Sequence, residues 1–293
     1  MERIDFIRNL SLLTIAGCTM KANALGKLVD AFPLSSKMPV LFLGHGNPMN
    51  AIEDNEFVQS FKKLGQDLET PKAILCISAH WETKGTKITA MEMPRTIHDF
   101  GGFPQALFDV QYPAKGSPEL AKQTKDLISK TEIELDHEWG LDHGAWTVIK
   151  HLYPEANIPV IQMSLDYSQA PQYHYELAQE LDTLRNHGVL IIGSGNIVHN
   201  LRKIAWDKVK DPFAWDWAEE ANEKMKSLIL SGNHKDLIHY TKQGEAFLQS
   251  VPTAEHYLPL LYTLGLKNEK ETIQLFNDQI IGGSLSMLSL KVG

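Results

Sequence analysis

Near the start of the chain stands Pro39-Val-Leu-Phe-Leu-Gly-His45-Gly-Asn-Pro-Met49. Residues 40–43 form an apolar run of strand length that ends abruptly in Gly-His-Gly, so the pattern predicts a buried strand that carries His45 onto a tight turn. The same order of residues recurs at Ala73-Ile-Leu-Cys-Ile-Ser-Ala-His80-Trp81. Two histidines are therefore expected just past the ends of two strands, where side chains in open α/β sheets gather into sites.

Short apolar runs alternate with helical patterns through the rest of the chain. Strands are expected at residues 71–78, 88–91, 158–164, 189–193 and 283–292, and helices at 53–68, 117–131, 170–186, 212–230 and 234–240. Alternation of this kind predicts the α/β class, with a mostly parallel central sheet flanked by helices. No linker or repeat divides the sequence, so a single domain is expected over residues 38–293.

Composition excludes several classes of protein. The 293 residues carry a formal net charge of −8 and no basic stripe, which argues against nucleic acid as a partner. The two cysteines, Cys18 and Cys76, are too few for a disulfide framework or a cysteine-rich metal site. After the N-terminal region, no stretch approaches the roughly 18 apolar residues of a transmembrane span.

Residues 1–37 read as an N-terminal extension. Residues 1–18 combine a short positive stretch, an apolar run and Ile15-Ala-Gly-Cys18, a pattern typical of a lipoprotein cleavage site. They also faintly resemble a twin-arginine leader that lacks one arginine. An amphipathic helix explains the same residues equally well. The sequence leaves open whether the protein is cytoplasmic or exported.

Two further histidines have contexts similar to those of His45 and His80. His199 follows the Gly-Ser-Gly that ends the apolar run at 189–193, and His256 lies where Thr253 is placed to cap a helix. Neutral imidazoles suit iron, zinc, copper and nickel. These four histidines predict a metal site, and Glu255 beside His256 also allows two histidines and one carboxylate.

Five motifs, in their order along the chain, resemble the bacterial 4,5-DOPA extradiol dioxygenase family, which belongs to the class III extradiol ring-cleaving dioxygenases, the superfamily of the protocatechuate 4,5-dioxygenase catalytic subunit. The resemblance runs from about residue 38 to the C-terminus. The motifs are Leu43-Gly-His-Gly-Asn-Pro-Met-Asn-Ala51, Ser78-Ala-His-Trp-Glu-Thr83, Thr96-Ile-His-Asp-Phe-Gly-Gly-Phe-Pro104, Ser194-Gly-Asn-Ile-Val-His-Asn-Leu201 and Pro252-Thr-Ala-Glu-His-Tyr-Leu-Pro-Leu-Leu261.

The resemblance implies an enzyme that opens a catechol ring with O2, with a DOPA-like substrate cleaved at its 4,5 bond to seco-DOPA. It implies His45, His80 and His256 as metal ligands, and His199 as either a fourth ligand or the catalytic acid/base. Relatives elsewhere in the superfamily use Fe(II), whereas the subfamily resembled here often holds zinc. Fe(II) is therefore expected for turnover and Zn(II) as a bound ion.

Further residues of these motifs are assigned to the substrate. His143 is a second candidate for the acid/base, and His98, Trp81 and Tyr257 are expected to contact the substrate, with Phe100 and Phe103 as further walls of a slot for a flat ring. For His98, a loop histidine beside an Asp99 that bonds the backbone is an equal alternative. Aromatic residues at such positions also commonly belong to the core.

Two other functions fit the same histidines. A zinc-dependent hydrolase would activate water at such a site, and a non-enzymatic metal-binding protein would use the fold for interactions. The hydrolase is expected to act without O2, and the binding protein is expected to turn over no catechol.

For the dioxygenase, the expected partners are a small catechol and O2. The oligomeric state is left open.

Overall fold

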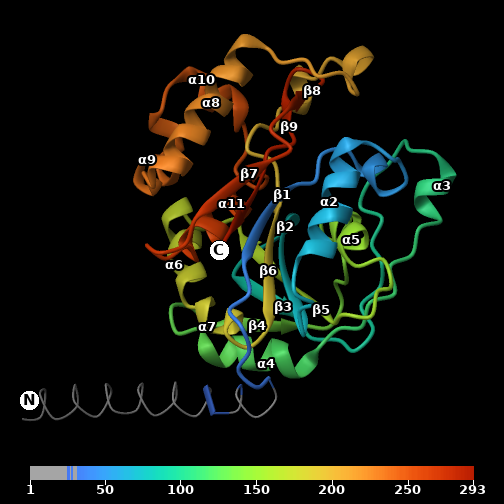
Figure 1. The fold of residues 1–293 in the computed structure, drawn as a ribbon, viewed down its shortest axis with the longest axis vertical. Helices are drawn as coiled ribbons and strands as arrows, with labels where there is room; N and C mark the ends of the chain where they lie inside the picture. Colours follow the sequence, from blue (N-terminus) through green and yellow to red (C-terminus); the bar gives the residue numbers. More distant parts are fainter. Residues whose placement is uncertain (1–24, 27, 29–31) are drawn as a thin grey trace, which may run out of the picture.

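An eight-stranded sheet runs through the computed structural model, which describes residues 25, 26, 28 and 32–293 (Figure 1). Its strands lie in the order β4-β3-β5-β2-β6-β1-β10-β7. Their bounds are β1 Val40–Gly44, β2 Ala73–Thr83, β3 Thr86–Thr89, β4 Ile133–Asp136, β5 Val160–Asp166, β6 Val189–Gly195, β7 Ile273–Phe276 and β10 Ser289–Val292.

The middle of the sheet is parallel. Strand β6 pairs in parallel with both β1 and β2, and β2 pairs in parallel with β5. Strand β10 joins the other side of β1 antiparallel, and β3 meets β5 antiparallel. The α/β class and the mostly parallel central sheet are thus confirmed. Because parallel strands all end at the same edge, the segments that follow β1 and β6 meet there.

Helices cover both faces of this sheet. Helices α2 (Glu56–Asp67) and α5 (His143–Leu152) pack together on one face, and α6 (Pro171–Gln179) and α11 (Leu258–Gly265) lie on the other (Figure 1). The side chains of β1 alternate between the two layers, as a strand buried on both faces requires. Val40 and Phe42 belong to the core on the α11 side, and Leu41 and Leu43 to the core on the α5 side.

The remaining helices agree only in part with those expected from the sequence. Residues 212–230 were expected to be helical, and α8 forms there; the helix expected at 170–186 is divided between α6 and α7. The further elements are α3 Gln105–Phe108, α4 Pro118–Leu127, α7 Asp182–Arg185, α8 Asp216–Ser231, α9 His234–Ile238 and α10 Glu245–Ser250, with 3-10 turns η1 Pro48–Ala51, η2 Leu201–Lys203, η3 Trp206–Lys208 and η4 Tyr240–Lys242.

The terminal strand expected at residues 283–292 is in fact two short strands. Strand β9 (Leu285–Ser286) pairs with β8 (Ile280–Ile281) in a separate two-stranded sheet, and only β10 joins the main sheet. The backbone of Ser286 donates to Val198 and that of Met287 to Gln279, so this segment leaves the ladder before β10 begins.

Residues 1–24 lie outside the described residues, and with them the leader sequence or amphipathic helix expected at 1–18. The domain boundary near residue 38 stays a prediction. Within the part of the chain that the structure describes, every helix is too short or too polar to cross a bilayer.

Candidate metal and substrate site

The first histidine of the site comes directly from the central sheet. Strand β1 ends at Gly44, and the backbone of His45 still donates to the carbonyl of Gly195 at the end of β6 (3.2 Å). Gly46 follows with a positive φ of 66°, a conformation that glycine adopts without strain. The chain therefore turns at once and leaves the buried His45 side chain at the edge of the sheet, as expected.

His80 reaches the same edge by a different route from the one expected. It lies inside β2, which continues to Thr83, and not beyond the end of the strand. The pairing of β2 with β5 shifts register between Ile77 and Glu82, and its pairing with β6 ends at Ser78. Because an irregularity of this kind re-aims a side chain, His80 projects toward the site from within the strand.

His256 lies in the turn before α11. The helix was expected to begin after Thr253, but it begins at Leu258, and Thr253 instead donates its hydroxyl to Glu255 (2.8 Å). The carbonyl of His256 accepts a hydrogen bond from the backbone of Asn196 just beyond β6 (2.9 Å). This contact fixes the turn against the sheet edge that carries His45.

The three side chains converge. Nε2 of His80 lies 3.3 Å from Nε2 of His45, and ligand atoms of His45, His80 and His256 all lie within 4.8 Å of one another. In His45 the other nitrogen, Nδ1, is 3.0 Å from the hydroxyl of Ser194, which donates its own hydrogen to the carbonyl of Gly144 (2.5 Å). The Ser194 oxygen can then only accept from Nδ1, which leaves Nε2 of His45 without a hydrogen.

His256 is held in the same manner, because its Nδ1 lies 3.1 Å from a carboxylate oxygen of Glu255. Burial lowers the pKa of His45 and of His256 well below the ordinary value, and burial lowers that of His80 to about 3. At neutral pH the rings are uncharged, and the partners of Nδ1 in His45 and His256 leave the lone pair on Nε2 in these two rings. Neutral imidazoles that converge in this way are the donor set of a transition-metal ion, so the three rings fit a metal ion.

His199 stands beside this group and not within it. Its ring is stacked on that of His256 with centroids 3.5 Å apart and planes at 6°. It shares a second cluster of potential ligands with Glu255 and His256, which does not include His45 or His80. Burial lowers the pKa of His199 to about 4. It is therefore a neutral ring in contact with the three-histidine group.

His143 is the first residue of α5, which the sequence reasoning did not anticipate as a helix. Asp142 caps the helix by accepting from the backbone of Ala145 (3.0 Å), and it also accepts from Ser78 of β2 (2.6 Å). A Cβ atom on Gly144 would lie 2.7 Å from a carbon of the His80 ring. The first turn of α5 thus approaches β2 closely enough to bring His143 and His80 together, with ring centroids 3.8 Å apart.

A cavity of about 460 Å³ opens in front of the histidines. It is lined by His45, His80, His143, His199 and His256, by Asp99, and by the turn at Gly46–Pro48. Its apolar wall comes from Phe100, Phe103, Leu201, Ile204, Trp206 and Leu285. Phe100 and Phe103 were expected there. Asp99 and the residues of the 201–206 segment were not, since no spacing or periodicity connects them to the histidines.

Three residues expected to contact substrate are absent from the lining of this cavity as the structure describes it. Trp81 is buried and stacks on Trp139, with ring centroids 5.7 Å apart. Tyr257 is buried in the α11 core and donates its hydroxyl to Leu237 (2.9 Å). His98 turns to the carbonyl of Val110 (2.9 Å), the loop role that was the equal alternative.

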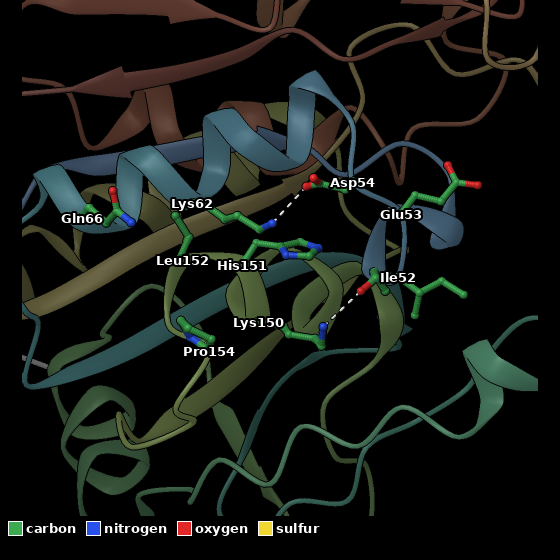
Figure 2. A pocket seen from close by; sticks show the side chains of 10 residues that line it. Ile52, Glu53, Asp54, Lys62, Gln66, Lys150, His151, Leu152 and Pro154 are labelled. Atoms are coloured by element: carbon green, nitrogen blue, oxygen red, sulfur yellow. Dashed lines mark hydrogen bonds and ion pairs between the residues drawn. The ribbon is translucent and has the colours of Figure 1, made fainter.

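A second cavity, also of about 460 Å³, lies between α2, α5 and the η1 turn (Figure 2). Lys150 donates to the carbonyl of Ala51 (3.1 Å), and His151 donates to that of Asn50 (2.8 Å). The side-chain amide of Asn50 in turn donates to the carbonyl of His45 (3.0 Å). Through these contacts, helix α5 holds in place the turn that follows His45.

Comparison with known proteins agrees with this geometry. Residues 33–283 match the family model described as the catalytic LigB subunit of aromatic ring-opening dioxygenase. The chain belongs to this family. Membership in the LigB family makes the protein an oxidoreductase of the extradiol dioxygenase class, which confirms the enzyme class that the five motifs implied.

Several relatives within the family are similar over nearly their whole length. The chain is 47% identical to a 4,5-DOPA dioxygenase extradiol of Escherichia coli K12, covering 90% of this chain and 98% of that one. It is 35% identical to a protein of the same name from Beta vulgaris, with 85% and 94% covered. The crystal structure of an uncharacterized protein from Escherichia coli K12 superposes with a TM-score of 0.76 at 42% identity, covering 87% of this chain and all of the other.

Proposed function

We propose that this protein is a metal-dependent extradiol dioxygenase that opens the ring of a small, DOPA-like catechol. The observation that carries the proposal is the 3.3 Å approach of two Nε2 atoms, those of His45 and His80, beside His256 at the base of an aromatic-walled cavity. The names of the similar proteins from Escherichia coli and Beta vulgaris support the substrate class.

In this proposal His45, His80 and His256 hold the metal through Nε2, with Fe(II) for turnover and Zn(II) as an ion that the same site retains. A redox-active metal at this position supplies the Lewis acidity and the electron transfer that O2-dependent ring opening needs. In this proposal Glu255 orients His256 and is not itself a ligand: its Oε1 atom accepts from Nδ1 of His256 (3.1 Å) and from the hydroxyl of Thr253 (2.8 Å).

The chain's own residues then orient the ring and move its protons. The edges and faces of Phe100 and Phe103, whose ring centroids are 5.4 Å apart, provide an apolar slot for a flat ring. His199, a neutral imidazole on the cavity wall, takes a proton from a catechol hydroxyl and returns it as the ring opens. His143 lines the same cavity and is the second acceptor available to the substrate.

The test is reconstitution of the metal-free protein with Fe(II) without air, followed by DOPA and O2. We expect stoichiometric O2 consumption and a yellow ring-opened product with Fe(II), and neither with Zn(II). A protein that consumes no O2 with any of a panel of catechols would overturn the proposal in favour of a hydrolase or a binding protein.

Two variants separate the proposed ligands from the proposed acid/base. His45→Ala is expected to lose the metal, whereas His199→Ala is expected to keep it and to lose about 10²- to 10⁴-fold in kcat, the usual contribution of general acid–base catalysis. Equal loss of metal in both variants would make His199 a fourth ligand.

A further inference from the structure

Asp99 stands between two histidines of the cavity. Its Oδ2 atom lies 3.0 Å from Nδ1 of His143 and 3.4 Å from Nδ1 of His80. Its Oδ1 atom accepts a hydrogen bond from the backbone of His143 (2.9 Å). Oδ1 therefore faces the backbone at the start of α5, and Oδ2 faces the rings of His80 and His143.

We infer that Asp99 is a positioning residue, whose charged Oδ2 atom keeps the ring hydrogens of both His80 and His143 on Nδ1. Both contacts are ion-pair contacts. A carboxylate oxygen is negatively charged and donates nothing, so it favours an N–H over a lone pair on each ring nitrogen that faces it. The nitrogen left without a hydrogen is then Nε2 in each ring. In His80 this is the atom that faces Nε2 of His45, and in His143 it becomes an acceptor at the cavity wall.

The same arrangement recurs at the other two rings. Nδ1 of His45 is 3.0 Å from the Ser194 hydroxyl, and Nδ1 of His256 is 3.1 Å from Glu255. Partners of this kind fix the tautomer and the orientation of metal-binding histidines. Asp99 differs because one oxygen serves both a proposed ligand, His80, and a ring that is not in the ligand group, His143. Asp99 thereby links the orientation of a proposed metal ligand to that of a histidine that faces the substrate.

A purely structural role for Asp99 would be confined to Oδ1, which joins the loop of residues 98–103 to the start of α5. Asp99→Asn separates the two roles. The amide oxygen of asparagine continues to accept from the backbone of His143, so the NH2 group takes the place of Oδ2. That group donates its hydrogens toward both Nδ1 atoms and moves the ring hydrogens to Nε2.

The decisive measurement is made on the metal-free, full-length protein. Nitrogen-15 NMR of histidine-labelled protein distinguishes the two tautomers, with signals assigned from His80→Gln and His143→Gln. We expect the Nδ1–H form at His80 and His143 in the wild type and the Nε2–H form at both in Asp99→Asn. Asp99→Ala, which provides no partner, is expected to give a mixture of the two forms.

Zinc affinity, measured by competition with a chelator, gives a second readout. Asp99→Asn is expected to bind zinc about 10- to 100-fold more weakly, the usual effect of removing such a partner. Asp109→Asn is the matched control, because it removes the same charge from an exposed carboxylate outside the cavity lining in the same region of the chain. It is expected to leave the tautomers and the zinc affinity unchanged.

The inference rests on the proposed function only for the identity of His80 as a metal ligand, and the two can fail separately. Unchanged tautomers in both Asp99 variants, in a folded protein, would overturn the inference even where the wild type consumes O2. A wild type that consumes no O2 would overturn the proposed function while the tautomer result stands.

Discussion

The hydroxyl of Ser194 lies 3.0 Å from Nδ1 of His45 and donates its own hydrogen elsewhere, so it serves His45 only as an acceptor. Replacing it by Ser194→Ala frees the His45 ring to place its hydrogen on either nitrogen. We expect zinc or Fe(II) affinity to fall about 10- to 100-fold, as is usual for such partners. Chelator competition measures this. Ser164→Ala, which removes another buried hydroxyl bonded to the backbone of Lys87 (2.8 Å), is expected to leave the affinity unchanged.

Gly144 is required where α5 approaches β2. In Gly144→Ala the new methyl group would lie 2.4 Å from the Ser78 hydroxyl and 2.7 Å from the His80 ring, so both side chains or the helix itself must move. Overpacking of this kind typically costs about 1–3 kcal/mol of stability, and a displaced His80 weakens metal binding. Urea unfolding and metal titration measure the two effects. Normal metal affinity in this variant would show that His80 can bind from another position.

Metal binding is expected to stabilise the fold. At 100 times its dissociation constant, an ion that binds only the folded state adds about 2.7 kcal/mol to the free energy of unfolding. The wild type should therefore melt higher with zinc than after chelation. His45→Ala should show no such increment, since it removes one of the three proposed ligands. An equal increment with Mg²⁺, which prefers oxygen ligands, would contradict a histidine site.

The aromatic wall is expected to act on substrate binding more than on chemistry. Phe103→Ala removes part of the slot, and loss of a ring contact of about 1.4 kcal/mol raises KM about tenfold with a smaller change in kcat. Phe108→Ala is the control, because Phe108 also packs on Phe100 (5.1 Å between centroids) but is not among the residues that line the cavity. Steady-state kinetics with a catechol compare the two variants. A larger rise in KM for Phe108→Ala than for Phe103→Ala would mean that the catechol ring does not bind against Phe103.

Stability at acidic pH should depend on Glu271. Burial alone raises the pKa of this carboxyl, but hydrogen bonds from the fully buried Arg185 and from the backbone of Asn268, together with the positive charges of Arg185 and Lys37, outweigh burial and hold the pKa below the ordinary value. The contribution is complete above about pH 5, where the carboxyl is ionised even in the unfolded chain. It is lost as pH falls through about 4.3 toward the folded-state pKa, since the unfolded chain takes up the proton first.

Urea unfolding between pH 7 and pH 3 tests this dependence. The midpoint should fall less steeply with pH in Glu271→Gln than in the wild type, while the exposed neighbour Glu269→Gln should follow the wild type. Identical slopes in all three proteins would mean that Glu271 has the same pKa in the folded and unfolded chains.

Much of the site could be read from the sequence, because strand ends are visible there. The apolar run before His45 and the glycines after it give the position of that ring, and the parallel sheet brings His256 to the same edge. The same reasoning did not separate Trp81 from its neighbour His80. Trp81 follows His80 in β2, but it stacks on Trp139 and is not among the residues that line the cavity.

Other parts depend on contacts between distant segments. Asp99 meets His143 across 44 residues, and nothing in the local pattern of either residue indicates the partner. The register shift that aims His80 arises from the pairing of β2 with β5. Trp206 lines the cavity from the start of the η3 turn, which is too short to show a periodicity in the sequence. Only the assembled sheet, with α5 against it, brings these residues together.

The two sides of the cavity are built from different material. The proposed ligands and His143 come from the end of β1, from within β2, from the turn before α11 and from the first turn of α5, where Gly144 leaves no space for an added methyl group. Half of the residues in the apolar wall, Leu201, Ile204 and Trp206, come from one short surface segment. Substitutions in that segment can therefore diversify the accepted substrates, during evolution or in a directed library, while the chemistry at the histidines is inherited unchanged.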